Sequence, residues 1–183
     1  MAKNDLPDDE RAGPALAIAT DRLALRRHRR DDLDACAAMW GDPLVTRHIG
    51  GKPFSAEEVW TKILRYAGHW SLMGFGYWVI EEKSSGRFVG EVGFADFKRA
   101  IAPPLGDAPE IGWALAAWAH GAGFATEAVG AAVAWGEAHF AAGRTVCMIG
   151  PDNAASIRVA AKSGYREFAR TTYKDRPTIL FER

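Results

Sequence analysis

The stretch of the chain that most constrains its fold runs from Glu110 to Ala128. It opens with a short apolar run, passes through the glycine turn Gly121-Ala-Gly123 and continues into an alanine-rich segment. Glycines leave the backbone N–H groups of a turn unobstructed, and the start of a helix carries about half a unit of positive charge. A strand, a glycine turn and a helix in this order predict a phosphate-binding turn at a helix N-terminus.

Strand-like and helix-like periods alternate along the rest of the chain, which predicts layered α/β structure. A capping box, Ser55 with Glu58, indicates the start of an amphipathic helix. Further helices are expected after Asp31 or Asp32, over 126–140, and from Asn153 to Gly164. Strands are expected at 22–27, 77–81, 88–97, from Glu110, at 145–149, and at 165–173 and 178–181, the last two forming a hairpin around Lys174 to Pro177.

The 183 residues show no internal repeat and no linker. Single hydrophobic cores commonly span about 100 to 200 residues, so we expect one domain over 15–183 behind a flexible leader, residues 1–14. The leader lacks the apolar core of a signal peptide, and no run approaches the roughly 20 apolar residues of a membrane span. We expect a cytoplasmic protein without a membrane partner, as a monomer or a homodimer.

Charge and cysteine usage exclude several classes of function. Basic and acidic residues balance at 23 each, which argues against nucleic-acid binding. The basic run Arg26 to Arg30 stands beside aspartates, so we expect a solvated strand end and a helix cap there. Cys36 and Cys147 lie far apart and the histidines lack metal-ligand spacing, so neither a disulfide nor a metal site is predicted.

Three kinds of phosphate-binding turn compete for Gly121 to Gly123. A P-loop needs Gly-Lys-Ser/Thr at its end, and that triplet is absent. A dinucleotide fingerprint needs a glycine or alanine where Thr126 stands, and a place after the first strand of a βαβ unit. The third kind has a glycine turn after a central strand and a second helix beginning in Asn-x-x-Ser, which matches Asn153 to Ser156.

Four motifs carry a more specific resemblance, in one order along residues 20–183. They are Arg22-Leu-Ala-Leu-Arg26, Glu110-Ile-Gly-Trp113, Gly123-Phe-Ala-Thr-Glu-Ala128, and Asn153-Ala-Ala-Ser-Ile-Arg158 with Lys162-Ser-Gly-Tyr165. Together they resemble the GNAT-family N-acetyltransferases, particularly the RimJ/RimL-like branch. The resemblance implies an α/β (α+β) fold: a mixed, mostly antiparallel sheet of about seven strands, helices on both faces, and a cofactor slot between two splayed central strands.

The resemblance also implies acetyl-CoA as the acetyl donor, with no metal. The family pattern Gln/Arg-x-x-Gly-x-Gly/Ala maps onto His120, Gly123 and Ala125, so a histidine replaces the usual first residue. Asn153 and Ser156 are equally consistent with helix capping, and Arg158 and Lys162 with a solvated helix face. The expected cofactor-binding residues are Trp113, Leu115, His120, Gly121, Ala122, Gly123, Phe124, Ala125, Thr126, Asn153, Ser156 and Arg158.

Acetyl transfer to an alkylamine requires a base, because such an amine is mostly protonated at neutral pH. Glu110 is the expected base, by resemblance to family members with a glutamate on this strand. The alternative is a strand-end carboxylate that faces solvent or pairs with an arginine, and Glu91 and Asp96 are second choices. Many relatives place a tyrosine acid where Ala160 stands, which leaves Ser156 as the fallback acid.

The sequence therefore predicts an acetyl-CoA-dependent N-acetyltransferase that transfers the acetyl group directly, in a ternary complex, to a primary amine. The acceptor is expected to be a protein N-terminus or a small-molecule amine, and a backbone N–H near Leu115 is expected to stabilise the oxyanion. The alternative is a non-catalytic acyl-CoA-binding or sensing module of the same fold, which Ala160 and His120 favour.

Overall fold

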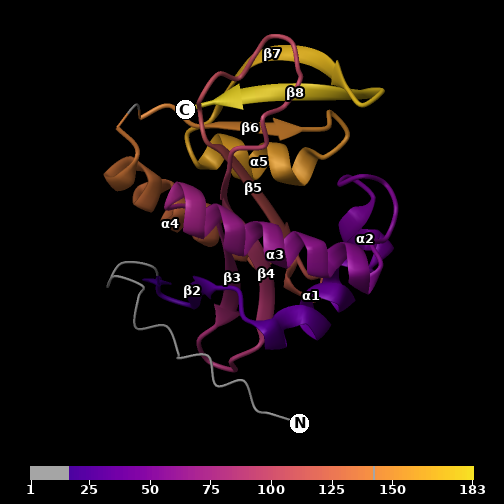
Figure 1. The fold of residues 1–183 in the computed structure, drawn as a ribbon, viewed down its shortest axis with the longest axis vertical. Coiled ribbons are helices and arrows are strands. Elements are labelled where there is room, and N and C mark those ends of the chain that lie inside the picture. Colours follow the sequence, from indigo (N-terminus) through magenta and orange to yellow (C-terminus); the bar gives the residue numbers. More distant parts are fainter. Residues whose placement is uncertain (1–16, 142) are drawn as a thin grey trace.

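The computed structural model describes residues 17–141 and 143–183, so the predicted leader, 1–14, lies outside the described residues (Figure 1). Eight strands form one sheet in the order β1-β2-β3-β4-β5-β6-β8-β7. Only β5 and β6 pair in parallel among the described strands. The strands are β1 (Ile18–Ala19), β2 (Leu23–Arg27), β3 (Tyr77–Glu82), β4 (Phe88–Ala95), β5 (Glu110–Leu115), β6 (Val146–Ile149), β7 (Arg166–Tyr173) and β8 (Arg176–Glu182).

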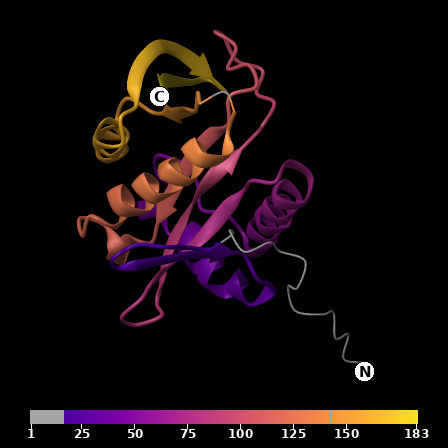
Figure 2. The same ribbon diagram turned by 90° about the vertical axis from the view of Figure 1, so that its left-hand side faces the viewer.

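Helices cover both faces of this sheet (Figure 2). The long helix α3 lies on one face and α4 on the other, and none of the described helices is long and apolar enough to cross a membrane. The predicted fold is thus confirmed, with one strand more than expected because the two-residue β1 is too short to show a period. The helices are α1 (Leu33–Trp40), α2 (Pro43–Thr46), α3 (Ala56–Met73), α4 (Phe124–His139) and α5 (Ala154–Lys162), with 3-10 turns at Arg30–Asp32 and Ala117–Ala119.

Two sequence signals set the helix starts that matter most. The predicted capping box is present, because the Ser55 hydroxyl accepts from the Glu58 N–H at 3.2 Å and the Ser55 N–H donates to the Glu58 carboxylate at 2.8 Å. Helix α4 begins at Phe124, two residues before the expected start. Gly123 is therefore its N-cap, with a left-handed φ of 83° that favours glycine.

One local prediction was wrong. The C-terminal hairpin turns over only two residues, Lys174 and Asp175, which both adopt positive φ, so β8 begins at Arg176 and includes Pro177.

A short helix that the sequence analysis did not predict, α2, begins directly after α1 ends. Asp42 caps the Leu44 N–H at 2.8 Å, and Pro43 occupies the first helical position.

The predicted slot opens between β5 and β6. These strands share one register pair, Glu110 with Val146, at the start of both. From there β6 pairs with β8 along its whole length, whereas β5 stays with β4. The two parallel strands therefore part toward their C-terminal ends, the ends from which α4 and α5 follow.

One face of β5 is built from small residues. Glu110, Gly112 and Ala114 alternate onto the same face of the strand. A Cβ added at Gly112 would lie 2.1 Å from the Tyr77 hydroxyl and 3.3 Å from the ring carbon that bears it. The phenol of Tyr77 therefore lies directly over Gly112, and no larger residue fits beneath it.

We expect Gly112→Ala to destabilise the protein by about 2 kcal/mol, because the added methyl group clashes with the Tyr77 hydroxyl. The double variant Gly112→Ala/Tyr77→Phe should recover most of that loss, since the remaining contact is to carbon at 3.3 Å. Urea denaturation of both variants and of Tyr77→Phe alone provides the measurement. Equal losses with and without the hydroxyl would contradict this packing.

Candidate functional site

A cavity of about 620 Å³ lies beside the C-terminal half of β5, on the side where β5 and β6 part. Its walls come from the second half of β5, the glycine turn, α5 with the residues just before it, and α2 with the residues after it. Among the residues expected to bind a cofactor, all except Ala122 and Phe124 line it: Trp113, Leu115, His120, Gly121, Gly123, Ala125, Thr126, Asn153, Ser156 and Arg158. The structure thus brings ten of the twelve predicted residues to one cavity, and the wall from Leu44 to Ile49 is a part of it that sequence reasoning did not predict.

The glycine turn has the backbone that a phosphate cradle needs. Gly121 and Gly123 adopt φ values of 77° and 83°, and both are exposed. A Cβ at Gly121 would meet no atom within 4 Å, so open space lies above the turn. The start of α4 adds the positive end of a 16-residue helix to this space.

Arg22 binds the glycine turn and helix α4 through its side chain. Its guanidinium donates to the Ala122 carbonyl at 2.9 Å and to Glu127 at 2.7 Å, and it lies 4.6 Å from the centroid of the Phe124 ring. Ala122 and Phe124 therefore connect the turn to the body of the protein. Sequence reasoning used Arg22 as a family motif but had no signal for this bracing contact.

His120 connects the turn to β5. Its Nε2 lies 2.9 Å from the Leu115 carbonyl oxygen, and because a carbonyl only accepts, this nitrogen donates. The histidine that replaces the family's Gln or Arg thus fixes the turn against the strand while also lining the cavity.

The cavity is basic. Arg47, Arg158 and Lys162 line it, against the single carboxylate of Asp152. Asp152 is itself engaged, because it accepts a hydrogen bond from His48 Nδ1 at 3.1 Å, which joins the α2 wall to the start of α5. A polyanionic ligand suits a cavity with this charge balance.

At the start of α5, Asn153 and Ser156 lie where they can serve both proposed purposes, capping the helix and contacting a ligand in the cavity. The Asn153 side chain caps the helix by accepting from the Ser156 N–H at 3.1 Å, and both residues also line the cavity. Ala160, where relatives place a tyrosine, is fully buried within the main core. A side chain at this position therefore packs inward in this protein.

Glu110, the expected base, does not line the cavity. It lies at the start of β5, largely buried, and both of its oxygens accept from Arg99: one from Nη2 at 2.7 Å and the other from Nε. Arg99 Nη1 also donates to the Tyr173 hydroxyl at 3.2 Å. The structure thus shows the alternative that the sequence left open, a pairing of Glu110 with an arginine.

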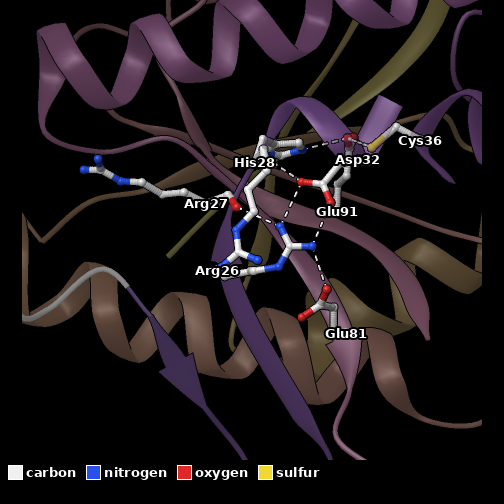
Figure 3. Close-up of polar contacts among 8 residues, drawn as sticks. Arg26, Arg27, His28, Asp32, Cys36, Glu81 and Glu91 are labelled. Atoms are coloured by element: carbon white, nitrogen blue, oxygen red, sulfur yellow. Dashed lines mark hydrogen bonds and ion pairs between the residues drawn. The ribbon is translucent and has the colours of Figure 1, made fainter. Parts of the chain in front are cut away.

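Glu91, a second choice for the base, is the centre of a buried polar cluster (Figure 3). It accepts from His28 at 2.9 Å, from Cys36 at 3.3 Å and from Trp40 at 2.9 Å. The ligand-type atoms of His28, Cys36 and Glu91 lie within 4.8 Å of one another, a grouping that sequence spacing did not reveal. Because each of them is engaged in this hydrogen bonding, we interpret the cluster as a structural network.

Charge compensates this buried carboxylate. Burial alone would raise the pKa of Glu91, but the hydrogen bond from His28 and the positive charge of Lys62 outweigh it and hold the pKa below its usual value. The Lys62 ammonium lies 4.1 Å from the centroid of the Trp40 ring and 5.2 Å from that of Phe54, and burial lowers its pKa to about 8.

The basic run before α1 is only partly solvated, which corrects the sequence-based expectation. Arg26 binds both oxygens of the buried Asp32, at 2.7 and 2.8 Å, and Glu81 at 2.6 Å (Figure 3). The Arg27 guanidinium lies over the Trp70 ring at 4.8 Å. Arg29 and Arg30 alone in this run are exposed. Two of the four arginines in this run, Arg26 and Arg27, are thus engaged in internal contacts.

Asp96, the other second choice, follows β4, which ends two residues earlier than predicted. Its carboxylate, which is partly buried, is 2.7 Å from the ammonium of the exposed Lys98. Burial opposes ionisation of this aspartate, but the bonds from Lys98 hold its pKa below the usual value.

Comparison with known proteins gives a consistent result. A family model described as an acetyltransferase (GNAT) domain matches residues 22–166. The uncharacterized protein YkkB of Bacillus subtilis is 29% identical over 174 residues, which cover 91% of this chain and 94% of that one. An uncharacterized N-acetyltransferase, p20 of Bacillus licheniformis, is 30% identical over 143 residues, 78% of each chain.

Solved structures share the fold over nearly the whole chain. A protein of Bordetella pertussis assigned to the GnaT-family acetyltransferases superposes with a TM-score of 0.79 at 27% identity, covering 91% of this chain and 98% of its own. RimL, a ribosomal L7/L12 α-N-protein acetyltransferase in complex with coenzyme A, superposes at 0.74 with 16% identity, covering 91% and 97%. At that identity the likeness is one of fold alone.

We expect Gly123→Ala to weaken coenzyme A binding about tenfold. The new methyl group has room, since its nearest neighbour is an Arg22 nitrogen at 3.4 Å, but a φ of 83° strains alanine by about 1 to 2 kcal/mol and distorts the turn. Gly130→Ala, in the middle of α4 with nothing within 4 Å, is the control and should leave affinity unchanged. Titration calorimetry measures both, and equal affinities would exclude the turn from the binding site.

We expect Glu91→Gln to lower the free energy of unfolding by about 3 kcal/mol, because it leaves Lys62 and several donors without a buried anion. A folded-state pKa below the unfolded value of 4.5 means that this contribution is complete above that pH and is lost as the pH falls through the folded pKa. The difference between wild type and variant in urea denaturation should therefore shrink on acidification. Glu57→Gln, exposed in α3, is the control, and a similar loss there would contradict the role of the cluster.

Proposed function

Because the chain belongs to the GNAT acetyltransferase family, we propose that it is an acetyl-CoA-dependent N-acetyltransferase, which moves an acetyl group to a primary amine by direct transfer in a ternary complex. The observation that carries the proposal is the basic cavity at the parting of β5 and β6, with the glycine turn in its wall. Several proteins with the same fold are found in complex with coenzyme A, among them RimL and a spermidine N-acetyltransferase of Vibrio cholerae.

In this proposal the cofactor spans the cavity. Backbone N–H groups from Gly121 to Thr126 hold the pyrophosphate, where open space meets the start of α4. Arg158 and Lys162, one helical turn apart on α5, bind the phosphate of the adenosine end. The pantetheine arm follows β5 between Trp113 and Leu115, along the strand edge that β6 leaves unpaired beyond Val146.

In this proposal, three groups carry out the acetyl transfer. Glu110 takes the proton of the acceptor amine, and a backbone N–H near Leu115 stabilises the oxyanion on the thioester carbonyl. Ser156 lines the cavity and is the candidate acid for the leaving thiolate, which needs little help because a thiol is acidic enough to leave as its anion.

We place the protein in the RimJ/RimL-like branch on the order of its four motifs, with a protein N-terminus or a small-molecule amine as acceptor. Structures of ribosomal-protein acetyltransferases share its fold at 16–18% identity. The proposal includes a cytoplasmic location, which suits two cysteines that are both free thiols. It also includes one domain over 15–183, a monomer or homodimer, and no metal, membrane or nucleic-acid partner.

One observation favours the second candidate, a non-catalytic acyl-CoA-binding module. Arg99 occupies both oxygens of Glu110, so neither oxygen is free to accept a proton from an amine in this arrangement. The two candidates differ in one measurement, the release of coenzyme A thiol in the presence of a panel of amines. A sensing module binds acetyl-CoA and leaves it intact with every amine, and failure of calorimetry to detect acetyl-CoA binding would refute both.

For the enzyme, we expect Glu110→Gln to lower kcat at least about 100-fold without weakening acetyl-CoA binding, because the amide cannot accept the proton. Glu57→Gln again serves as the control. A Glu110→Gln variant that keeps the wild-type rate would assign the base elsewhere.

A further inference from the structure

The imidazole of His120, at the start of the glycine turn, has two nitrogens in different situations. Nε2 donates to the Leu115 carbonyl at 2.9 Å, so in the neutral ring this nitrogen carries the proton. Nδ1 then carries a lone pair, and no other described residue makes a hydrogen bond to it. Because His120 is exposed, protons from solvent can reach this nitrogen.

Nδ1 lies beside the place where the pyrophosphate is proposed to bind. In any histidine it is the ring nitrogen closer to the residue's own main chain, and here that main chain leads directly into Gly121. His120, Gly121, Gly123 and Thr126 line the cavity together, and a Cβ at Gly121 would meet no atom within 4 Å. A phosphate bound to the N–H groups of this turn therefore has Nδ1 as a near neighbour.

The protonation state of His120 decides whether this neighbour attracts or repels the phosphate. Phosphate oxygens accept hydrogen bonds, so a lone pair on Nδ1 would face another acceptor. A protonated ring carries an N–H on both nitrogens: Nε2 keeps its bond to Leu115, and Nδ1 can donate a charge-assisted hydrogen bond to the phosphate. The glutamine or arginine typical of this position carries an N–H donor without taking up a proton.

One other side chain around this space can change charge near neutral pH. An imidazole titrates between about pH 5 and 8, whereas ordinary carboxylate, guanidinium and ammonium groups do not. His48 is the second histidine that lines the cavity, and its Nδ1 donates to Asp152 at 3.1 Å. The remaining charged side chains are Arg22 and Glu127 beside the turn, Arg47 on the α2 wall, and Arg158 and Lys162 on α5.

Resting on the proposed function, we propose that His120 couples cofactor binding to proton uptake, because the pyrophosphate of acetyl-CoA or coenzyme A binds to the protonated imidazole. The proton enters from solvent onto Nδ1 and returns to solvent when the cofactor leaves. The complex thus holds this proton more tightly than the free protein does. By linkage, affinity is highest at low pH and falls as the pH rises through the range in which the complex loses the proton.

Titration calorimetry measures this proton directly. The ligand is dephospho-coenzyme A, which keeps the pyrophosphate but lacks the phosphate monoester of the adenosine end, a group that titrates near pH 6 itself. Binding is measured from about pH 6 to 8, at each pH in buffers that differ in their enthalpy of ionisation. For wild type we expect uptake of about half a proton or more per ligand near pH 7, and a Kd about fivefold higher at pH 8 than at pH 6.

Two variants of His120 separate the proton from the hydrogen bond. His120→Gln keeps an N–H donor and His120→Arg keeps a permanent positive charge, so both should bind the ligand without proton uptake. His120→Arg should bind at pH 8 about as tightly as wild type does at pH 6. The matched control is His139→Gln, because His139 also bonds a backbone carbonyl, that of Trp135 at 2.7 Å, but lies outside this cavity. It should keep the wild-type uptake.

His48→Gln tests the second histidine of the cavity. Loss of the uptake in this variant, with its persistence in a folded His120→Gln, would overturn the inference and assign the proton to His48. Binding to wild type with no proton uptake and with equal Kd across the range would overturn it too, and would leave the N-acetyltransferase in place.

Coenzyme A replaces the dephospho ligand if that ligand binds too weakly to measure. Its own phosphate monoester contributes to the uptake in wild type and variant alike, so the difference in uptake between wild type and His120→Gln then decides. A difference of zero would overturn the inference alone. Failure of coenzyme A itself to bind would overturn the proposed function, and the inference with it.

Discussion

The parting of β5 from β6 is the constraint on which the rest of the structure depends. Two parallel neighbours in a sheet normally continue their hydrogen bonding, but here one pair, Glu110 with Val146, is all that joins them. Because β8 takes the other edge of β6 and holds it along four register pairs, β6 is turned away from β5. Beyond this pair, the backbone N–H and C=O groups along the facing edges of β5 and β6 do not bond to each other, so they are free to bond to a ligand.

The same divergence explains where the helices begin. Both α4 and α5 follow the ends of the parted strands, so their N-termini face the opening from two sides. Gly123 and Asn153 make these starts possible in different ways, the first by a left-handed backbone and the second by a side-chain cap. A cavity with two helix N-termini and basic side chains is a consequence of strand topology as much as of any single residue.

How much of this was visible in the sequence depends on the range of the interaction. Periodicity and local signals predicted the main helices and strands. Local signals such as a capping box or a glycine turn involve only a few consecutive residues, as at Ser55 and Gly123, so they can be recognised in the sequence. Helix α2 was missed because four residues carry no period, although Asp42 followed by Pro43 is a start signal. The order of the motifs predicted residues that the structure places around one cavity, whereas no motif pointed to the α2 wall of that cavity.

Long-range polar contacts were beyond sequence reasoning, and they bear most directly on the chemistry. The sequence does not show that Arg99 contacts Glu110, or that Glu91 contacts His28 and Cys36. The loops and turns between these residues have no regular repeat from which their relative positions could be predicted. Yet the two carboxylates differ in how they are held. Glu91 accepts from three donors in two segments, His28 after β2 and both Cys36 and Trp40 on α1, whereas Glu110 accepts from Arg99 on the loop between β4 and β5. Glu110 is therefore the carboxylate to which we assign the proposed role of base, because a single partner on a loop is more readily exchanged than the donors that enclose Glu91.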